Sequence, residues 1–273
     1  MDIIQRNFFR LLRTGAFDDK EVVEPMSAFK WRRLYQMVEV QNVTDIFVSG
    51  VNKQSKEESL NLPDDLKADV QQRLDAAAPS KKLTTGLEQV ELSNHFLNKK
   101  LRKLMNAERH SIDTSLETMQ LLSIIITNMN SMLNNGLSLS GIIRLGQYLR
   151  RRGDRVDFVK LESWLHQLHL SRMAQLEGSI LMVVFGFEQD ELPFVVKEEK
   201  DAYDLTIRAI SNLAKDTAKE WHFRQSSTGF VRNNSAILRR NIRRSIRYIN
   251  YAPVETTSSF FTNLARSLSE IEE

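Results

Sequence analysis

Apolar residues recur at helical spacing along most of the chain. Ile4, Phe8, Leu11 and Leu12 fall on one face near the N-terminus, and Gly15 is predicted to end that helix. Five further stretches show the same pattern: 31–38, 43–51, 62–74, 158–168 and 176–187. Residues 43–51 have strand propensity, but no partner strand is evident nearby, so a short helix is predicted.

The strongest pattern occupies the middle of the chain. An apolar stripe runs from Val90 to Met105, and residues 116–133 are apolar on nearly all sides. A helix of the second kind is predicted to be central and buried. Asn134-Asn135-Gly136 ends it, and Ser138 or Ser140 is expected to cap the next helix.

Only 10 Gly and 5 Pro occur in 273 residues, which favours long helices over the many turns of a strand-rich fold. The predicted fold is all-α, a bundle-like array with a long central buried helix. Three regions are expected: N-terminal helices over 1–51, a polar linker with a weak helix over 52–86, and a main helical domain over 87–273. One packed domain is the alternative.

The composition is that of a globular protein, with 41% hydrophobic and 27% charged residues. The net charge of +3 is too balanced to indicate nucleic acid, and the absence of cysteine excludes thiolate metal sites and disulfides. Arg6 and Arg10 interrupt the N-terminal apolar residues, unlike a signal peptide, and no apolar run approaches the ~20 residues of a membrane span. A cytoplasmic protein without a membrane span is predicted.

Three segments carry a family resemblance. They are Asn7-Phe-Phe-Arg-Leu-Leu-Arg-Thr-Gly with Trp31-Arg-Arg-Leu-Tyr and residues 43–50, then 132–194, and finally Arg244-Ser-Ile-Arg-Tyr-Ile-Asn-Tyr-Ala-Pro-Val-Glu. In this order they resemble the helical regions of a nucleotidyltransferase-like family of Bacteroidetes. The resemblance implies a bacterial origin.

The resemblance does not extend to the catalytic core of that family, which is a small sheet with a Lys-Gly loop, an Arg and an Asp-x-Asp pair. Such carboxylates hold the metal ions of phosphoryl transfer. Residues 86–131 contain Asp113 as their only aspartate. Thr127 and Ser131 stand where the family implies histidines, and Ser140 and Arg144 where it implies an Arg and an Asp. A pseudoenzyme is therefore predicted, with no catalytic residue and no metal ligand.

The most basic stretch, 221–254, contains seven arginines and no acidic residue. Five of these are predicted as an anion-binding face: Arg239, Arg240, Arg243, Arg244 and Arg247. On a helical wheel they lie mostly opposite Leu238, Ile242, Ile246 and Ile249. The competing interpretation is a solvated face, neutralised by acids such as Glu198, Glu199, Asp201 and Glu220.

Two further basic groups are present, and anion binding would gain support if all three shared one surface. Arg150, Arg151, Arg152 and Arg155 surround Gly153 at a predicted helix end, where they complement the helix dipole. Lys99, Lys100, Arg102 and Lys103 occupy the polar side of their helix. His166 and His169 are spaced for one helix face, but no third metal ligand follows.

Three functions are compatible with these patterns. The first is a non-catalytic nucleotidyltransferase-like protein that binds a protein partner or an anionic ligand. The second is a nucleotidyltransferase with a rearranged metal site, for example from Asp190, Glu191 and Asp201. The third is a helical module that binds nucleic acid or phosphate. No cofactor is predicted, and Mg²⁺ would be needed only for the second.

Overall fold

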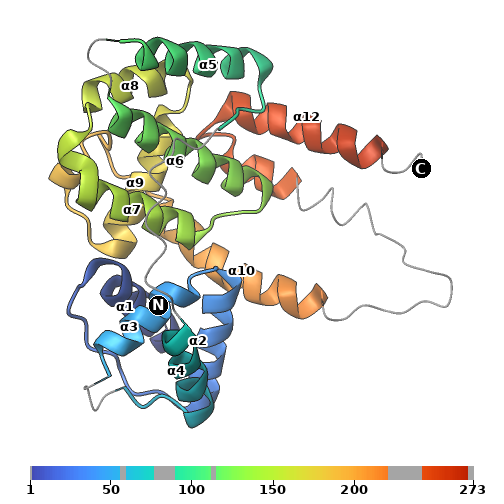
Figure 1. The fold of residues 1–273 in the computed structure, drawn as a ribbon. Coiled ribbons are helices and arrows are strands. Elements are labelled where there is room, and N and C mark those ends of the chain that lie inside the picture. The colour runs from blue at the N-terminus through green and yellow to red at the C-terminus, as the bar shows by residue number, and fades with distance from the viewer. Residues whose placement is uncertain (1, 56–59, 77–89, 112–114, 221–241, 270–273) are drawn as a thin grey trace. The chain divides into compact units, whose positions relative to one another are not determined.

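The structure is a computed structural model that describes residues 2–55, 60–76, 90–111, 115–220 and 242–269; the side chains of 76, 212–220 and 265–269 are not described. Every regular element among these residues is a helix, and no strand occurs in them (Figure 1). The all-α prediction is confirmed, including the part of the chain where the family resemblance would require a sheet.

The chain divides into two compact units. The first comprises Met1–Gly86 with Ile210–Ala218, and the second comprises Leu87–Ala209 with Lys219–Glu273. Each has its own apolar core and is described by itself.

The described residues of the first unit include α1 (Ile3–Phe17), α2 (Ala28–Val40), α3 (Thr44–Lys53), α4 (Asp64–Ala76) and a later part of α10 (Ala202–Glu220). Asp2 begins α1, because its carboxylate accepts a hydrogen bond from the Gln5 backbone N–H at 2.8 Å. Phe8, Trp31 and Phe47 are fully buried in the core between α1, α2 and α3. The weak pattern at 62–74 forms α4, whose Leu66 and Val70 are buried.

Gly15 does not end the first helix, so that prediction was wrong. α1 continues to Phe17 and ends at Asp18, whose φ is 63°. Gly15 instead lets α1 approach α3, because a Cβ at this position would lie 2.0 Å from the Ile46 carbonyl oxygen. Gly50 of α3 faces α1 in the same way, with the Leu11 carbonyl oxygen 2.2 Å from its own hypothetical Cβ. These glycines serve a close helix crossing rather than a turn.

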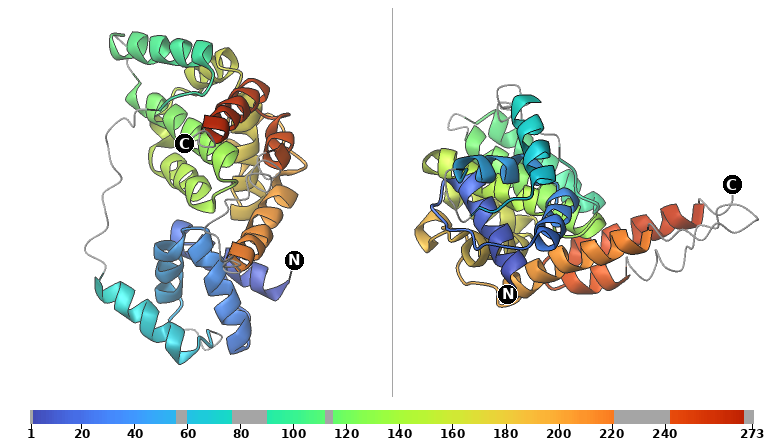
Figure 2. Two further views of the ribbon diagram at one scale, coloured as in Figure 1. Left: turned by 90° about the vertical axis from the view of Figure 1, so that its right-hand side faces the viewer. Right: turned by 90° about the horizontal axis from the view of Figure 1, so that it is seen from below.

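The second unit has a longer series of elements, shown from two further directions in Figure 2. They are α5 (His95–Arg109), α6 (Leu116–Asn134), α7 (Leu139–Arg152), η1 (Gly153–Arg155), α8 (Phe158–Gln167), α9 (Ser171–Phe185), η2 (Gln189–Glu191), the first residues of α10 (Ala202–Glu220), a helical segment at 242–248, and α12 (Pro253–Ser269).

Helix α6 is the predicted central buried helix. It contacts α7, α8, α9 and α12, and Leu121, Leu122, Ile125 and Ile126 are fully buried. α7 runs antiparallel to α6, since the Tyr148 hydroxyl near its end donates to the Glu117 carbonyl oxygen at 2.9 Å. The start of α6 therefore lies beside the end of α7.

Local capping matches the sequence patterns unevenly. Asp157 begins α8 by accepting a hydrogen bond from the Lys160 N–H at 2.9 Å. Ser138 occupies the cap position of α7 but makes no side-chain cap bond, and its hydroxyl lies 2.8 Å from that of Ser140. The serine cap was therefore predicted at the correct residue but with the wrong contact.

The N-terminus of α5 is held by a residue far away in the sequence. Glu255 of α12 is buried, and its carboxylate accepts the backbone N–H groups of Ser93 at 2.7 Å and Asn94 at 3.2 Å. Asn94 in turn caps α5 through the N–H of Leu97 at 3.1 Å. The glutamate of the Ala-Pro-Val-Glu turn thus fastens α12 to α5.

Candidate anion-binding surface

The helical segment 242–248 is mounted on the turn that joins α6 to α7. Tyr248 is its buried residue, and the backbone of Leu137 in that turn hydrogen-bonds its hydroxyl. The Arg244 guanidinium donates to the carbonyl oxygen of Asn134, the last residue of α6. A helix C-terminus carries unpaired carbonyls and partial negative charge, so it attracts a cation. Arg244 therefore has a structural contact.

Burial and neighbouring arginines act in opposite directions on the pKa of the Tyr248 hydroxyl. Burial raises the pKa of its hydroxyl, while the positive charges of Arg247 and Arg244 act in the opposite direction. The arginines therefore lie near the buried tyrosine and help to fix which side of the segment faces the protein.

The opposite side of the segment carries isoleucines in solvent. Ile246 is 66% exposed, Ile242 37% and Ile249 39%. At about 100° per residue these three positions fall within about 60° of each other, so they form one row. They share a face as the sequence predicts, and the described protein covers that face only in part, least at Ile246.

Arg243 lies beside the isoleucine row, whereas Arg247 lies further round the helix, where its side chain hydrogen-bonds Tyr248. Arg243 is exposed and Arg247 is half-buried, and the two lie one helical turn apart. We call these four residues the isoleucine–arginine face: Ile242, Arg243, Ile246 and Ile249. Of the remaining arginines predicted to bind anions, Arg244 contacts Asn134, and Arg239 and Arg240 lie outside the described residues.

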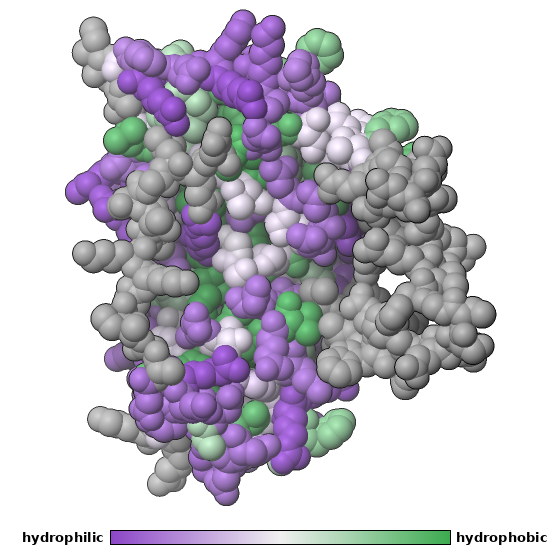
Figure 3. Space-filling view, turned by 45° about the vertical axis from the view of Figure 1, so that its right-hand side comes forward, coloured by the Kyte–Doolittle hydropathy of each residue, from purple (hydrophilic) through white to green (hydrophobic). Residues whose placement is uncertain are grey.

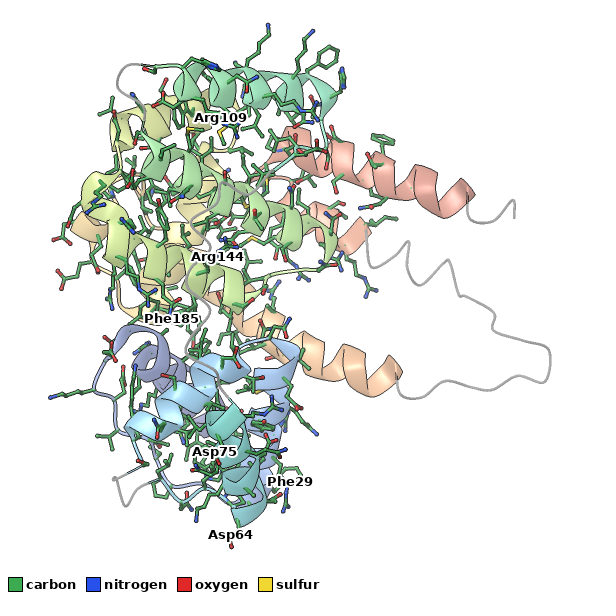
Figure 4. The ribbon with its side chains drawn as sticks, in the orientation of Figure 1. Phe29, Asp64, Asp75, Arg109, Arg144 and Phe185 are labelled. Atoms are coloured by element: carbon green, nitrogen blue, oxygen red, sulfur yellow. The ribbon has the colours of Figure 1, made fainter. Side chains whose placement is uncertain are left out.

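Exposed apolar side chains are otherwise spread over separate elements. Phe29 on α2, labelled in Figure 4, Phe96 on α5 and Val159 on α8 are each more than 70% exposed. Figure 3 shows a largely hydrophilic surface, on which hydrophobic side chains stand apart from one another. Scattered residues of this kind are normal in soluble proteins, whereas a row on one helix face indicates a possible contact surface.

Two of the acids expected to neutralise the basic face have other partners. Glu199 pairs with Arg172 at 3.2 Å and accepts a hydrogen bond from Gln175 at 2.8 Å. Asp201 accepts the Tyr251 hydroxyl at 3.2 Å, and burial raises the pKa of that tyrosine to about 12. Glu198 is exposed, and the side chain of Glu220 is not described.

Arg172, Glu199 and Asp201 also line an open surface hollow of about 360 Å³, together with Gln175, Lys197, Glu198 and Lys200. Its charged side chains comprise three cations and three anions, so it favours neither sign of ligand. The hollow therefore does not add to the case for an anion site.

The three basic groups do not form one surface. Arg150 lies at the C-terminal end of α7, where it pairs with Glu191 at 2.9 Å and stacks 4.2 Å from the centre of the Phe187 ring. Arg244 lies at the other end of the antiparallel α6–α7 pair, about 20 Å along α7. Lys99, Lys100, Arg102 and Lys103 are exposed on α5, as predicted.

Sequence reasoning missed a buried polar pair in the second unit. Asn128 of α6 donates hydrogen bonds to Glu177 of α9 at 2.9 Å and to the Gly141 carbonyl oxygen of α7 at 3.2 Å. Glu177 is fully buried, and its Oε1 has no hydrogen-bond partner among the described residues. The available signal was one acidic residue within the largely apolar stretch 176–187.

The residues considered as metal ligands remain separate. α8 ends at Gln167, so His169 lies beyond the helix with φ 57° and does not share a helix face with His166. Glu191 binds Arg150 and the Glu188 backbone N–H, whereas Asp201 binds Tyr251. Within the described part of the chain, no group of three or more His, Asp or Glu is placed to hold a metal ion.

The positions where the family resemblance implies polar catalytic residues make local contacts. The Thr127 hydroxyl donates to the Ser123 carbonyl oxygen at 2.8 Å within α6, and Ser140 contacts Ser138. Ser131 is half-buried in the last turns of α6. Arg144, labelled in Figure 4, is half-buried on α7.

Among the described residues, no helix combines the length and apolar character needed to cross a bilayer. Comparison with protein-family models, with curated proteins and with solved structures finds no match for this chain.

Proposed function

We propose that this chain is a non-catalytic relative of the nucleotidyltransferase-like proteins and acts by binding an anionic partner. The observation that carries the first half is the course of the backbone through α5 and α6. These helices occupy 95–109 and 116–134, where the resemblance requires strands for the metal-binding carboxylates. The proposal includes a bacterial, cytoplasmic setting.

The isoleucine–arginine face supports the second half of the proposal. Arg243 is exposed on a segment that Tyr248 and Arg244 anchor to the α6–α7 turn. A guanidinium held on a fixed helix can form paired hydrogen bonds with phosphate or sulfate oxygens. The stretch 221–254 has no acidic residue to compete for these arginines locally.

Retention on an immobilised sulfated polyanion, heparin, tests the binding half. The full chain should be retained at low salt and elute as salt rises, because the contact is electrostatic. Arg243→Gln should elute at clearly lower salt.

Lys100→Gln is the matched control, since Lys100 is an exposed cation on α5 and the substitution changes the net charge equally. Equal shifts for both variants would show that net charge, and not this face, governs retention. No retention of the full chain at low salt would contradict the binding proposal.

An active enzyme with rearranged carboxylates has less support. It needs two or more acids that converge on one metal, whereas Glu191 and Asp201 each have a different local partner. A nucleic-acid-binding module would use the same arginines, but the exposed isoleucines would have no role in it.

A further inference from the structure

We propose that the isoleucine–arginine face binds the surface of an anionic lipid bilayer, with the segment 242–248 lying in the plane of the membrane. The inference rests on the proposed anion-binding function and names the partner class. It starts from the juxtaposition of the partly exposed Ile242, Ile246 and Ile249 with the exposed Arg243.

The isoleucines favour a lipid surface over nucleic acid. Contacts with nucleic-acid phosphates use charged and polar groups, so a row of branched aliphatic side chains adds nothing to them. Ile246 is 66% exposed although the same helix buries Tyr248. An interfacial helix uses both kinds of residue, because its apolar side chains enter the acyl boundary while its arginines remain among the headgroups.

The charge of the surrounding sequence specifies an anionic bilayer. Residues 221–254 contain seven arginines and no Asp or Glu. Headgroup phosphates accept paired hydrogen bonds from guanidinium groups, and each basic residue near an anionic leaflet strengthens the attraction. A neutral bilayer offers the apolar contribution alone.

The mounting of the segment defines how it meets the bilayer. Tyr248 is buried, and Arg244 is bound to the Asn134 carbonyl oxygen, so one side of the helix is fixed to the protein. The other side can therefore enter the interface without first folding.

Vesicle co-sedimentation of the full chain tests the inference. Vesicles of phosphatidylcholine mixed with phosphatidylglycerol should bind the protein, and pure phosphatidylcholine vesicles should bind it far more weakly. Ile246→Ser should weaken binding to the anionic vesicles about tenfold. Arg243→Gln should weaken it about fivefold, and added salt should reduce it further.

Val159→Ser is the matched control. Val159 is 81% exposed on α8, and the start of α8 contacts the start of α6. The isoleucine–arginine face lies instead at the end of α6, where Arg244 contacts Asn134. Its replacement should leave vesicle binding unchanged. Ile242→Ser provides a second probe of the row, and circular dichroism of each variant checks that the helices are retained.

Each alternative outcome overturns the inference. Absence of binding to the anionic vesicles would show that the face does not enter a bilayer. Binding by Ile246→Ser and Ile242→Ser that equals wild-type binding would show the same. Binding to duplex DNA that is unaffected by Ile246→Ser, without vesicle binding, would assign the arginines to nucleic acid. Retention on heparin without vesicle binding would leave the proposed anion-binding function standing while this inference fails; loss of both would end the two together.

Discussion

Asn128 Nδ2 donates a 2.9 Å hydrogen bond to Glu177 Oε2 in the interior of the second unit, and so joins α6 to α9. Burial raises the pKa of the Glu177 carboxyl well above 4.5, and the hydrogen bond from Asn128 only partly opposes that shift. Because ionisation of a buried carboxyl without a cationic partner is unfavourable, burial favours the neutral form of Glu177 in the folded unit.

The first prediction is a loss of stability with rising pH that depends on Glu177. The folded pKa exceeds the unfolded value, so this contribution to stability is complete below pH 4.5 and is lost as pH rises through the folded pKa. Each unit of difference corresponds to about 1.4 kcal/mol. Glu177→Gln should remove this pH dependence and stabilise α6 and α9 at neutral pH, as measured by amide hydrogen exchange.

Glu162→Gln is the control for this measurement, because Glu162 is exposed on α8 and its removal should leave the pH profile of wild type intact. A Glu177→Gln variant with the same pH profile as wild type would show that Glu177 does not titrate in the way proposed.

The second prediction concerns the crossing of α1 and α3. Gly15→Ala should destabilise the first unit by about 1–3 kcal/mol, because the new Cβ meets the Ile46 carbonyl oxygen and the backbone must move apart. Urea denaturation followed by exchange of the α1 amides measures this effect. Gly153→Ala is the matched control: it has nothing within 4 Å of its hypothetical Cβ and a φ of −53°, so it should be neutral or stabilising.

The third prediction concerns the bond between α12 and α5. Glu255→Ala should increase hydrogen exchange at the start of α5, because the N–H groups of Ser93 and Asn94 lose their acceptor. The expected loss of stability is about 2–3 kcal/mol. Ser258→Ala removes a neutral 3.1 Å hydrogen bond with Asn94 and should have a smaller effect. Equal exchange in Glu255→Ala and wild type would contradict the role of Glu255.

Helix positions followed from local sequence wherever an apolar row and a capping residue agreed. Asp157 before Phe158 is such a case, and the nearly uniform apolar run at 116–133 correctly indicated a buried helix. Both signals depend on residues within one or two turns of each other, so they can be recognised without knowledge of the fold.

The errors arose where a distant segment decided the outcome. Gly15 is suited to a helix end, but α3 supplies the close neighbour that gives it a different role. The sequence identifies the arginines of the predicted anion-binding face. It does not show that Arg243 is exposed whereas Arg244 contacts the protein.

We propose that this helical framework does not carry out nucleotidyl transfer. A transfer assay with labelled nucleoside triphosphate and Mg²⁺ or Mn²⁺ should therefore show no metal-dependent turnover above that of a heat-denatured sample, because α5 and α6 occupy the segment where metal-binding strands would be required. Metal-dependent turnover that a single Asp→Asn or Glu→Gln substitution abolishes would show instead that the chain is an enzyme.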